Sequence, residues 1–232
     1  MLNKKDNMFS LYWAKKVRAI NILGGKCNKC GNNNIFVMEF HHNGNDKDFK
    51  ISGYGNMFKH WSKLLKEIEK CSVLCANCHC EEHYTVGRSS DKKREFLISM
   101  GKEKCDICGY HGQNLNSLCF HHNGNKLFNV SNYFARKCVG TTLADLQKEV
   151  EKCNIICKNC HILRHSSDII ENFNRLKEFI DFKIENHQEN QRIDKNVVLG
   201  FKNEGKSMAE ISRIIGTSRS AIHYILRKSD LC

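Results

Sequence analysis

Apolar residues recur at helical spacing in several segments of the chain, and short runs rich in β-branched and aromatic residues lie between them. The two patterns occur in the same order twice: a leading helix, two short strands, an amphipathic helix and a closing helix. In the first copy these elements are predicted at 13–23, 35–40, 49–52, 61–70 and at or just after 78–79. In the second copy they are predicted at 92–100, 118–120, 128–131, 143–152 and at or just after 160–161.

Short motifs align at equivalent places in the two copies, which identifies an internal duplication. The aligned motifs are CxxCG at 27–31 and 105–109, FHHNGN at 40–45 and 120–125, and EKC followed by CxxCH at 69–79 and 151–161. Asn-Gly predicts a turn directly after each paired histidine. We therefore predict an α+β chain with a first repeat at 9–90, a second at 91–166, a connecting helix and linker at 167–193 and a small all-α domain at 194–229.

The pattern after the repeats is helical. Apolar spacing predicts a helix over 168–185, a polar stretch at 186–194, and tail helices over 197–203, 208–215 and 218–227. Ser207 is a natural N-cap and Gly216-Thr217 a tight turn, which together give the pattern of a helix-turn-helix. Its predicted inward face is Ile211, Ile214, Ile215, Ile222 and Ile225. Its predicted outward side chains are Ser218, Arg219, Ser220, His223, Tyr224 and Arg227.

The charge of the chain favours a polyanion as its partner. There are 37 Lys and Arg against 25 Asp and Glu, a net charge of +12, which is typical of proteins that bind nucleic acid but does not by itself decide the matter. The N-terminal sequence has no secretory signal, and no apolar run approaches the roughly 20 residues that span a bilayer. We therefore expect a soluble, intracellular protein with no membrane partner.

Eight of the 14 cysteines form two CxxC…CxxC quartets. The first consists of Cys27, Cys30, Cys75 and Cys78, and the second of Cys105, Cys108, Cys157 and Cys160. Four thiolates at this spacing suit tetrahedral Zn²⁺ and leave no open position for chemistry, so each quartet predicts a structural zinc site. Disulfides or a redox CxxC are the alternatives. Cys71 and Cys153 are expected to be buried free thiols.

The histidines also fall into two equivalent sets. His79 and His83 are four residues apart, as are His161 and His165, so each pair projects from one face of a helix as a potential chelate. Neighbouring histidines on a strand point to opposite faces. In each pair, His41-His42 and His121-His122, one histidine can therefore bind a metal while the other remains a base.

With these motifs in place, the chain resembles the HNH nucleases of the ββα-metal type, in the zinc-stapled form with the signature CxxC…HH…CxxCHxxxH. The resemblance covers 20–84 and 98–166 and implies two tandem zinc-stapled ββα-metal units. It implies that the first histidine of each pair binds a divalent cation and that the second is the general base. The implied cation ligands are His41, His79 and His83 in the first unit and His121, His161 and His165 in the second. The implied bases are His42 and His122.

Two features qualify the resemblance. The asparagine that names the motif is replaced by Lys70 and Lys152, five residues before the second CxxC. The first unit also carries Glu39 before its histidine pair, where the second carries Cys119. Three imidazoles favour Zn²⁺, Ni²⁺ or Mn²⁺ by ligand preference, whereas Mg²⁺ is more available in cells, so the catalytic ion stays open.

The tail resembles the helix-turn-helix of resolvases and homing endonucleases, whose second helix enters the major groove. The resemblance implies that Arg219 reads a guanine edge and that Ser220 and Tyr224 contact bases or phosphate, with His223 and Arg227 on the same exposed face. A three-helix bundle that binds protein is the alternative.

Together these features predict a site-specific, metal-dependent endonuclease that acts on double-stranded DNA and makes double-strand breaks with two sites on one chain. A monomer would suffice, and a homodimer stays open. The helix-turn-helix favours a homing over a restriction role. The alternatives are a non-catalytic zinc-containing DNA-binding regulator, a chain in which only one unit cuts, and RNA or a branched junction as the substrate.

Overall fold

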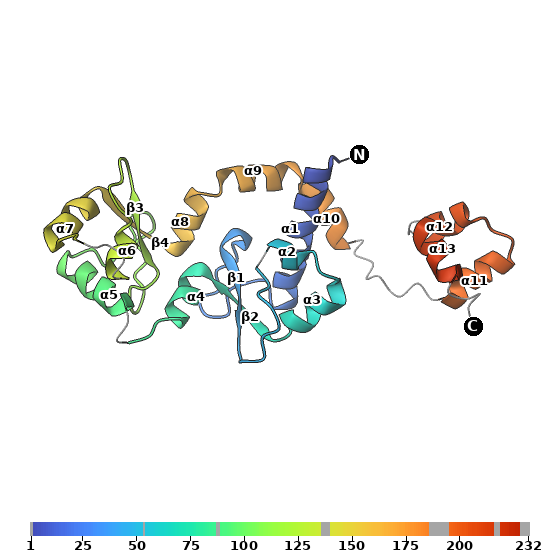
Figure 1. The fold of residues 1–232 in the computed structure, drawn as a ribbon, viewed down its shortest axis with the longest axis horizontal. Helices are drawn as coiled ribbons and strands as arrows, with labels where there is room; N and C mark the ends of the chain where they lie inside the picture. Colours follow the sequence, from blue (N-terminus) through green and yellow to red (C-terminus); the bar gives the residue numbers. More distant parts are fainter. Residues whose placement is uncertain are drawn as a thin grey trace. The chain divides into compact units, whose positions relative to one another are not determined.

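The computed structural model describes residues 2–52, 54–86, 89–135, 140–185, 195–215 and 219–227. It divides into two compact units, 1–185 and 186–232 (Figure 1). Both repeats belong to the first unit, and the three tail helices belong to the second. Within the described residues, no helix is both long and apolar enough to cross a lipid bilayer. The predicted α+β fold class is confirmed: two hairpin units, each with a cysteine quartet and a histidine triad, precede the C-terminal helices.

Each repeat is built around an antiparallel two-stranded sheet. In the first repeat β1 (Met38–His42) pairs with β2 (Cys71–Cys75), so that His42 lies opposite Cys71. In the second repeat β3 (Leu118–His122) pairs with β4 (Cys153–Cys157), so that His122 lies opposite Cys153. The two sheets have the same register at every position, which is the structural counterpart of the duplicated sequence.

The predicted second strands, at 49–52 and 128–131, are wrong. Residues 49–52 form bends and turns, and α6 (Val130–Phe134) takes the second half of the segment 128–131. The second strand of each sheet is instead the segment that leads into the second CxxC. Four of its five residues are buried in both copies, and a strand buried on both faces lacks the apolar–polar alternation by which strands are recognised.

The remaining predicted helices of the repeats are confirmed with shifted ends. The first repeat contains α1 (Lys4–Ile22), the 3₁₀ turn η1 (Ile35–Val37), α2 (Tyr54–Met57), α3 (Trp61–Ile68) and α4 (Ala76–Glu82). The second contains α5 (Ser89–Ser99), α6, α7 (Leu143–Glu151) and α8 (Lys158–Arg164). The closing helices α4 and α8 begin inside the CxxC motifs, two residues earlier than expected. Thr142 and Asp145 form a capping box that fixes the start of α7.

The amphipathic helices α3 and α7 hold the sheets in place. Leu64 and Ile68 of α3 are fully buried in a core that includes Trp61 and Cys71. In the second repeat, Leu146 and Val150 belong to one core together with both strands of the sheet. Because β1 and β3 end in the paired histidines, this packing fixes the backbone that carries them.

A helical segment after the second repeat folds back onto the first. The single helix predicted over 168–185 is two helices, α9 (Ser167–Arg175) and α10 (Lys177–Glu185), which meet at Leu176. α10 lies beside α1 (Figure 1), and its Ile180 shares a core with Phe173 of α9 and Trp13 of α1. Two hydrogen bonds of 2.9 and 2.7 Å join the Arg175 guanidinium to Asp6 of α1. The chain therefore ties its second repeat to the N-terminal helix of its first.

The tail unit consists of α11 (Lys195–Asn203), α12 (Met208–Ile215) and α13 (Arg219–Arg227). Its centre is formed by Val198, Ile211 and Ile222, which are fully buried. Ser207 caps α12, since its hydroxyl accepts from the Glu210 N–H at 3.3 Å and the Glu210 carboxylate accepts from the Ser207 N–H at 2.8 Å.

Of the predicted inward face of the tail, Ile211 and Ile222 are buried and Ile225 is partly buried. Ile214 is 53% exposed, so its assignment to that face is wrong. The packed stripe of so short a helix is narrow, and Ile211 fills it together with the partly buried Met208. The side chain of Ile215, the turn at Gly216-Thr217 and Ser218 lie outside the described residues.

Candidate metal centres

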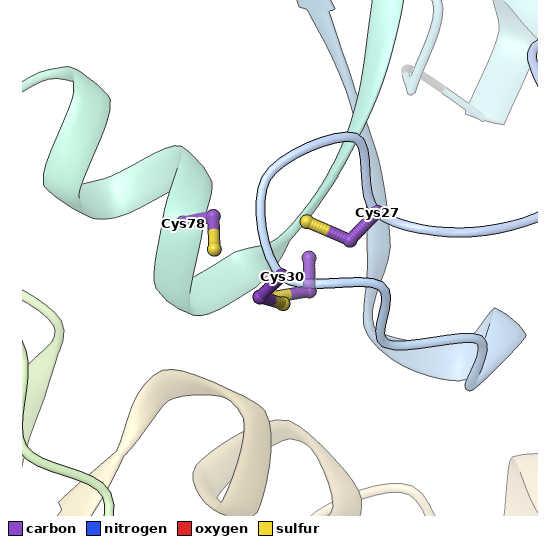
Figure 2. Close-up of side chains that lie close together, drawn as sticks. Cys27, Cys30 and Cys78 are labelled. Atoms are coloured by element: carbon purple, nitrogen blue, oxygen red, sulfur yellow. The ribbon is translucent and has the colours of Figure 1, made fainter.

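The first cysteine quartet joins three elements of its repeat. Figure 2 shows Cys27 and Cys30 on the loop after α1 and Cys78 in the first turn of α4, with their sulfur atoms turned toward one another. Cys75, at the end of β2, completes the set. All four sulfur atoms lie within 4.8 Å of one another, and the Cys30 and Cys75 sulfurs are 3.7 Å apart. A tetrahedral ion with Zn–S bonds of about 2.3 Å requires sulfur atoms roughly 3.8 Å apart, so the quartet has the size of a zinc site.

The second quartet repeats this arrangement. Its four sulfur atoms also lie within 4.8 Å of one another, with the Cys108 and Cys157 sulfurs 3.8 Å apart. In both knuckles the glycine after the second cysteine has positive φ, 73° at Gly31 and 70° at Gly109, and donates its N–H to the carbonyl of the first cysteine at 2.9 Å. A side chain there would strain the turn that brings both thiols to one point.

The protonation chemistry of the quartets suits a bound cation. Burial raises the pKa of Cys27, but N–H groups of Cys75, Cys30 and Lys29 outweigh it and bring the pKa to about 7. The Cys105 thiol has a pKa of about 7 through the same balance. Burial and the neighbouring Cys75 raise the pKa of Cys78, because thiolates this close repel one another. A divalent cation removes that repulsion, so the two quartets are candidate structural zinc sites.

The described cysteines are free thiols, so the disulfide alternative finds no support. Cys71 and Cys153 are buried, as predicted, and donate to the carbonyl oxygens of Glu67 and Glu149. Cys138 and Cys232 lie outside the described residues.

The structure brings each predicted histidine triad together. His41 comes from β1, His79 from α4 and His83 from the residue that caps α4, and a ligand nitrogen of each lies within 4.8 Å of the others. The ring centroids are 5.3, 5.1 and 4.7 Å apart. In the triad His121, His161 and His165 the corresponding distances are 5.5, 5.2 and 4.8 Å. The duplication has therefore preserved the triad geometry to within 0.2 Å (5.5 − 5.3).

The triads suit a metal ion for two reasons. Burial, followed by the charges of His79 and His83, lowers the pKa of His41, and burial likewise lowers the pKa values of His121 and His161, so the neutral imidazole that binds metal is favoured. The Nδ1 atom of His41 is also buried without a hydrogen-bond partner among the described residues, an arrangement that a metal ion would relieve.

The second histidine of each pair lies apart from the triad, as strand alternation predicts. His42 contacts a carboxylate and not the histidines of the triad, since its Nε2 lies 2.8 Å from Oε1 of Glu67. The equivalent contact joins His122 Nε2 to Oε1 of Glu149 at 3.0 Å. Both histidine side chains are about one-tenth exposed, 10% and 12%, so solvent can reach them.

Glu67 and Glu149 are site residues that the sequence prediction missed. Oε1 of Glu67 also accepts from the N–H groups of Asp48 and Phe49, and that of Glu149 accepts from Leu127. The sequence did contain a signal for them. The first glutamate of EIEKC and of EVEKC lies on the apolar face of its amphipathic helix, and burying a carboxylate there costs free energy unless it has hydrogen-bonding or charged partners. Burial raises the pKa of Glu67, but hydrogen bonds from Phe49, His42 and Lys70 outweigh it and lower the pKa to about 2; the pKa of Glu149 is also about 2.

These carboxylates predict a stability that depends on pH. Because their folded pKa lies below the ordinary 4.5, they stabilise the protein above pH 4.5 by about 3 kcal/mol each, and this contribution is lost as the pH falls toward 2. Denaturant unfolding of Glu67→Gln and Glu149→Gln should show that deficit at pH 7 and a shrinking one below pH 4.5. The exposed Glu69→Gln and Glu151→Gln, two residues on, are the matched controls. A deficit that does not change with pH would contradict the assignment.

Lys70 and Lys152, which replace the motif asparagine, hold the loop after each histidine pair. The Lys70 carbonyl accepts from the Asn43 N–H at 3.1 Å, and the Lys152 carbonyl accepts from the Asn123 N–H at 3.2 Å. Their ammonium groups lie 3.1 and 2.9 Å from the second oxygens of Glu67 and Glu149. The main-chain carbonyls of the two lysines therefore anchor the loops. Their ammonium groups compensate the negative charge of the buried carboxylates.

The two repeats meet at their closing helices. The N–H of Asn77 donates to Oδ1 of Asn159 at 3.1 Å, and the N–H of Asn159 donates back to Oδ1 of Asn77 at 2.9 Å. Exchange of equivalent bonds is what a two-fold interface produces, here within one chain. Beside it, His79 and His83 of the first triad and His161 of the second line one pocket of about 420 Å³. The two asparagines thus join the closing helices that carry histidines of the two triads.

The predicted DNA-contacting side chains lie on α13. Arg219, Ser220, His223, Tyr224 and Arg227 are all exposed. Tyr224 is 61% exposed. Their exposure satisfies the first requirement for a contact surface.

Comparison of the chain with protein-family models, with curated proteins and with solved structures finds no match.

Proposed function

We propose that this chain is a metal-dependent endonuclease of the HNH type that hydrolyses phosphodiester bonds in double-stranded DNA. The observation that carries the proposal is a combination present twice: a histidine triad within ligand distance, and next to it on the same strand a histidine held by a buried carboxylate. A structural zinc site alone requires neither. Each feature recurs with nearly the same distances, so the arrangement is a property of the unit.

The residues divide the work of hydrolysis between them. The divalent cation bound by a triad would stabilise negative charge on the phosphate and on the leaving oxygen. With its Nε2–H donated to Glu67, neutral His42 presents an unprotonated Nδ1 that can take a proton from the attacking water. Glu67 fixes this tautomer and stabilises the imidazolium that forms, which makes it a positioning residue. His122 and Glu149 have the same roles in the second repeat.

DNA is the proposed substrate because of charge and of the tail. The net charge of +12 favours a polyanion, and α13 exposes two arginines with hydroxyl and aromatic side chains, as a recognition helix does. Two sites on one chain, joined through Asn77 and Asn159, would allow one molecule to cut both strands. A tail that extends the contacted sequence favours a homing over a restriction role.

Plasmid cleavage with defined metals tests the proposal. With Mg²⁺ or Mn²⁺, supercoiled plasmid should become nicked and then linear, and EDTA should prevent both. The double variant His83→Ala/His165→Ala removes one ligand from each triad and should leave the plasmid supercoiled, while His60→Ala/His111→Ala, at exposed histidines outside the triads, should cut normally. Binding that leaves the plasmid intact with every metal would instead identify a DNA-binding regulator.

A further inference from the structure

The two triads have the same geometry but different neighbours. In the first repeat Oε2 of Glu39 lies 2.5 Å from Nδ1 of His79. Cys119 occupies the equivalent position on β3, one residue before Phe120, and among the described residues no carboxylate lies within ion-pair distance of His161. One triad therefore has a carboxylate directly behind a ligand, and the other has none.

The closing helices add a second difference. Glu82 follows His79 by three residues, and Arg164 follows His161 by three. The charge of Glu82 acts on His41 and His83, although Lys29 pairs with Glu82 and offsets part of it. In the second triad, the positive charge of Arg164 acts on His121.

Lys158, which begins α8 where α4 has Ala76, does not separate the two triads. It lines the shared pocket with Glu39, His79 and His83 of the first repeat and with His161 of the second, so its charge acts on both. The difference between the triads is therefore the Glu39 carboxylate beside His79, together with Glu82 in place of Arg164.

A carboxylate that is hydrogen-bonded to a metal-binding histidine raises the affinity of that site for the metal ion. Glu39 accepts the Nδ1–H of His79, which fixes the tautomer that offers Nε2 as the ligand atom. That Nε2 lies 3.1 Å from Nε2 of His83, so the two ligand nitrogens already face the same point. The anion also makes the imidazole more basic, whereas Arg164 in the second repeat repels an incoming cation.

We propose that the two triads are unequal cation sites, and that Glu39 makes the first repeat bind a divalent cation more tightly than the second. The proposal rests on the proposed function only in taking both triads as divalent-cation sites. Its consequence for cleavage is a fixed order: at limiting metal the first repeat is loaded and one strand is cut before the other.

Calorimetric titration with Mn²⁺ in the absence of DNA tests this, because Mn²⁺ disfavours thiolates and leaves zinc in the quartets. His165→Ala leaves only the first triad complete, and His83→Ala only the second. The first protein should bind Mn²⁺ at least about 10-fold more tightly than the second. Adding Glu39→Gln to the first should weaken binding by about 10- to 100-fold, while adding it to the second should change nothing.

The reciprocal variant installs the missing group. Cys119→Glu in the His83→Ala protein should tighten Mn²⁺ binding toward the affinity of the first site. Two zinc ions per chain and an unchanged circular dichroism spectrum identify variants that have folded. Equal affinities at the two sites, or no effect of Glu39→Gln on the first, would overturn the proposal. Since no DNA is present, a protein that binds Mn²⁺ unequally but never cuts would refute the nuclease and leave the unequal sites standing.

Discussion

Replacing His42 and His122 together by alanine is expected to reduce DNA cleavage by about 10²- to 10⁴-fold, the contribution of a general base. The triads do not include either residue, so metal binding should persist in this variant. Each single variant should retain one intact site and therefore convert a double-strand cutter into a nicking enzyme. The nicked strand should be opposite in His42→Ala and His122→Ala, because the repeats are related by a two-fold exchange at Asn77 and Asn159.

Strand-specific sequencing of the cut ends provides the measurement. The matched controls are His60→Ala and His111→Ala, one exposed histidine in each repeat outside the triads. If either His42→Ala or His122→Ala cuts both strands at the normal rate, the repeat that carries it is not catalytic.

Glu67→Gln distinguishes the positioning role from the base itself. The amide keeps an oxygen for His42 and for the two backbone donors but removes the charge that would stabilise an imidazolium. Its cleavage rate should fall less than that of His42→Ala, and its pH–rate profile should shift, because the histidine it orients loses its anionic partner. A loss of activity with an unchanged pH profile would point to a structural role alone.

The sequence predicted the sites better than it predicted the sheet. Spacing placed both quartets and the HxxxH pair of each triad, because CxxC and HxxxH are local patterns whose geometry depends on one turn or one helix face. The third ligand of each triad, His41 or His121, was implied by the resemblance to the HNH nucleases. The strands β2 and β4 were missed for the opposite reason. They are short, buried on both faces and preceded closely by a helix. Their hydrophobic pattern therefore does not distinguish them from a continuation of that helix.

The contacts that escaped prediction are those between distant segments. Glu67 reaches His42 across 25 residues, and Asn77 reaches Asn159 across 82. Neither contact produces a periodic pattern of apolar residues in the sequence. The only sign of them is that each of these residues occurs at the equivalent position in both repeats. The fold-back of α9 and α10 onto α1 likewise depends on how Phe173 of α9 packs against Trp13 of α1, which a hydrophobic pattern does not encode.

Removing the quartet zinc is expected to unfold the repeat that holds it. Structural zinc contributes about 10–16 kcal/mol to small zinc-binding peptides, which equals or exceeds the roughly 5–15 kcal/mol of net stability of a whole domain. In the described residues each repeat has a sheet of two strands, and the quartet joins the knuckle loop to both the sheet and the closing helix. Cys30→Ser and Cys108→Ser should therefore each lower the zinc content from two ions per chain to one.

The loss should also spread from one repeat to the other, because the closing helices share the Asn77–Asn159 bonds and α10 packs on α1. Thermal unfolding of Cys30→Ser and Cys108→Ser should thus show a lower transition for the whole of residues 1–185, and limited proteolysis should cut the repeat that keeps its zinc faster than in the unmodified protein. Cys80→Ser and Cys119→Ser, which change partly buried cysteines outside the quartets, should keep two zinc ions and a transition close to that of the unmodified protein. If one repeat resisted proteolysis while its partner lost zinc, the interface would be a contact between independent domains, and coordinated cleavage of two strands would need DNA itself to align the sites.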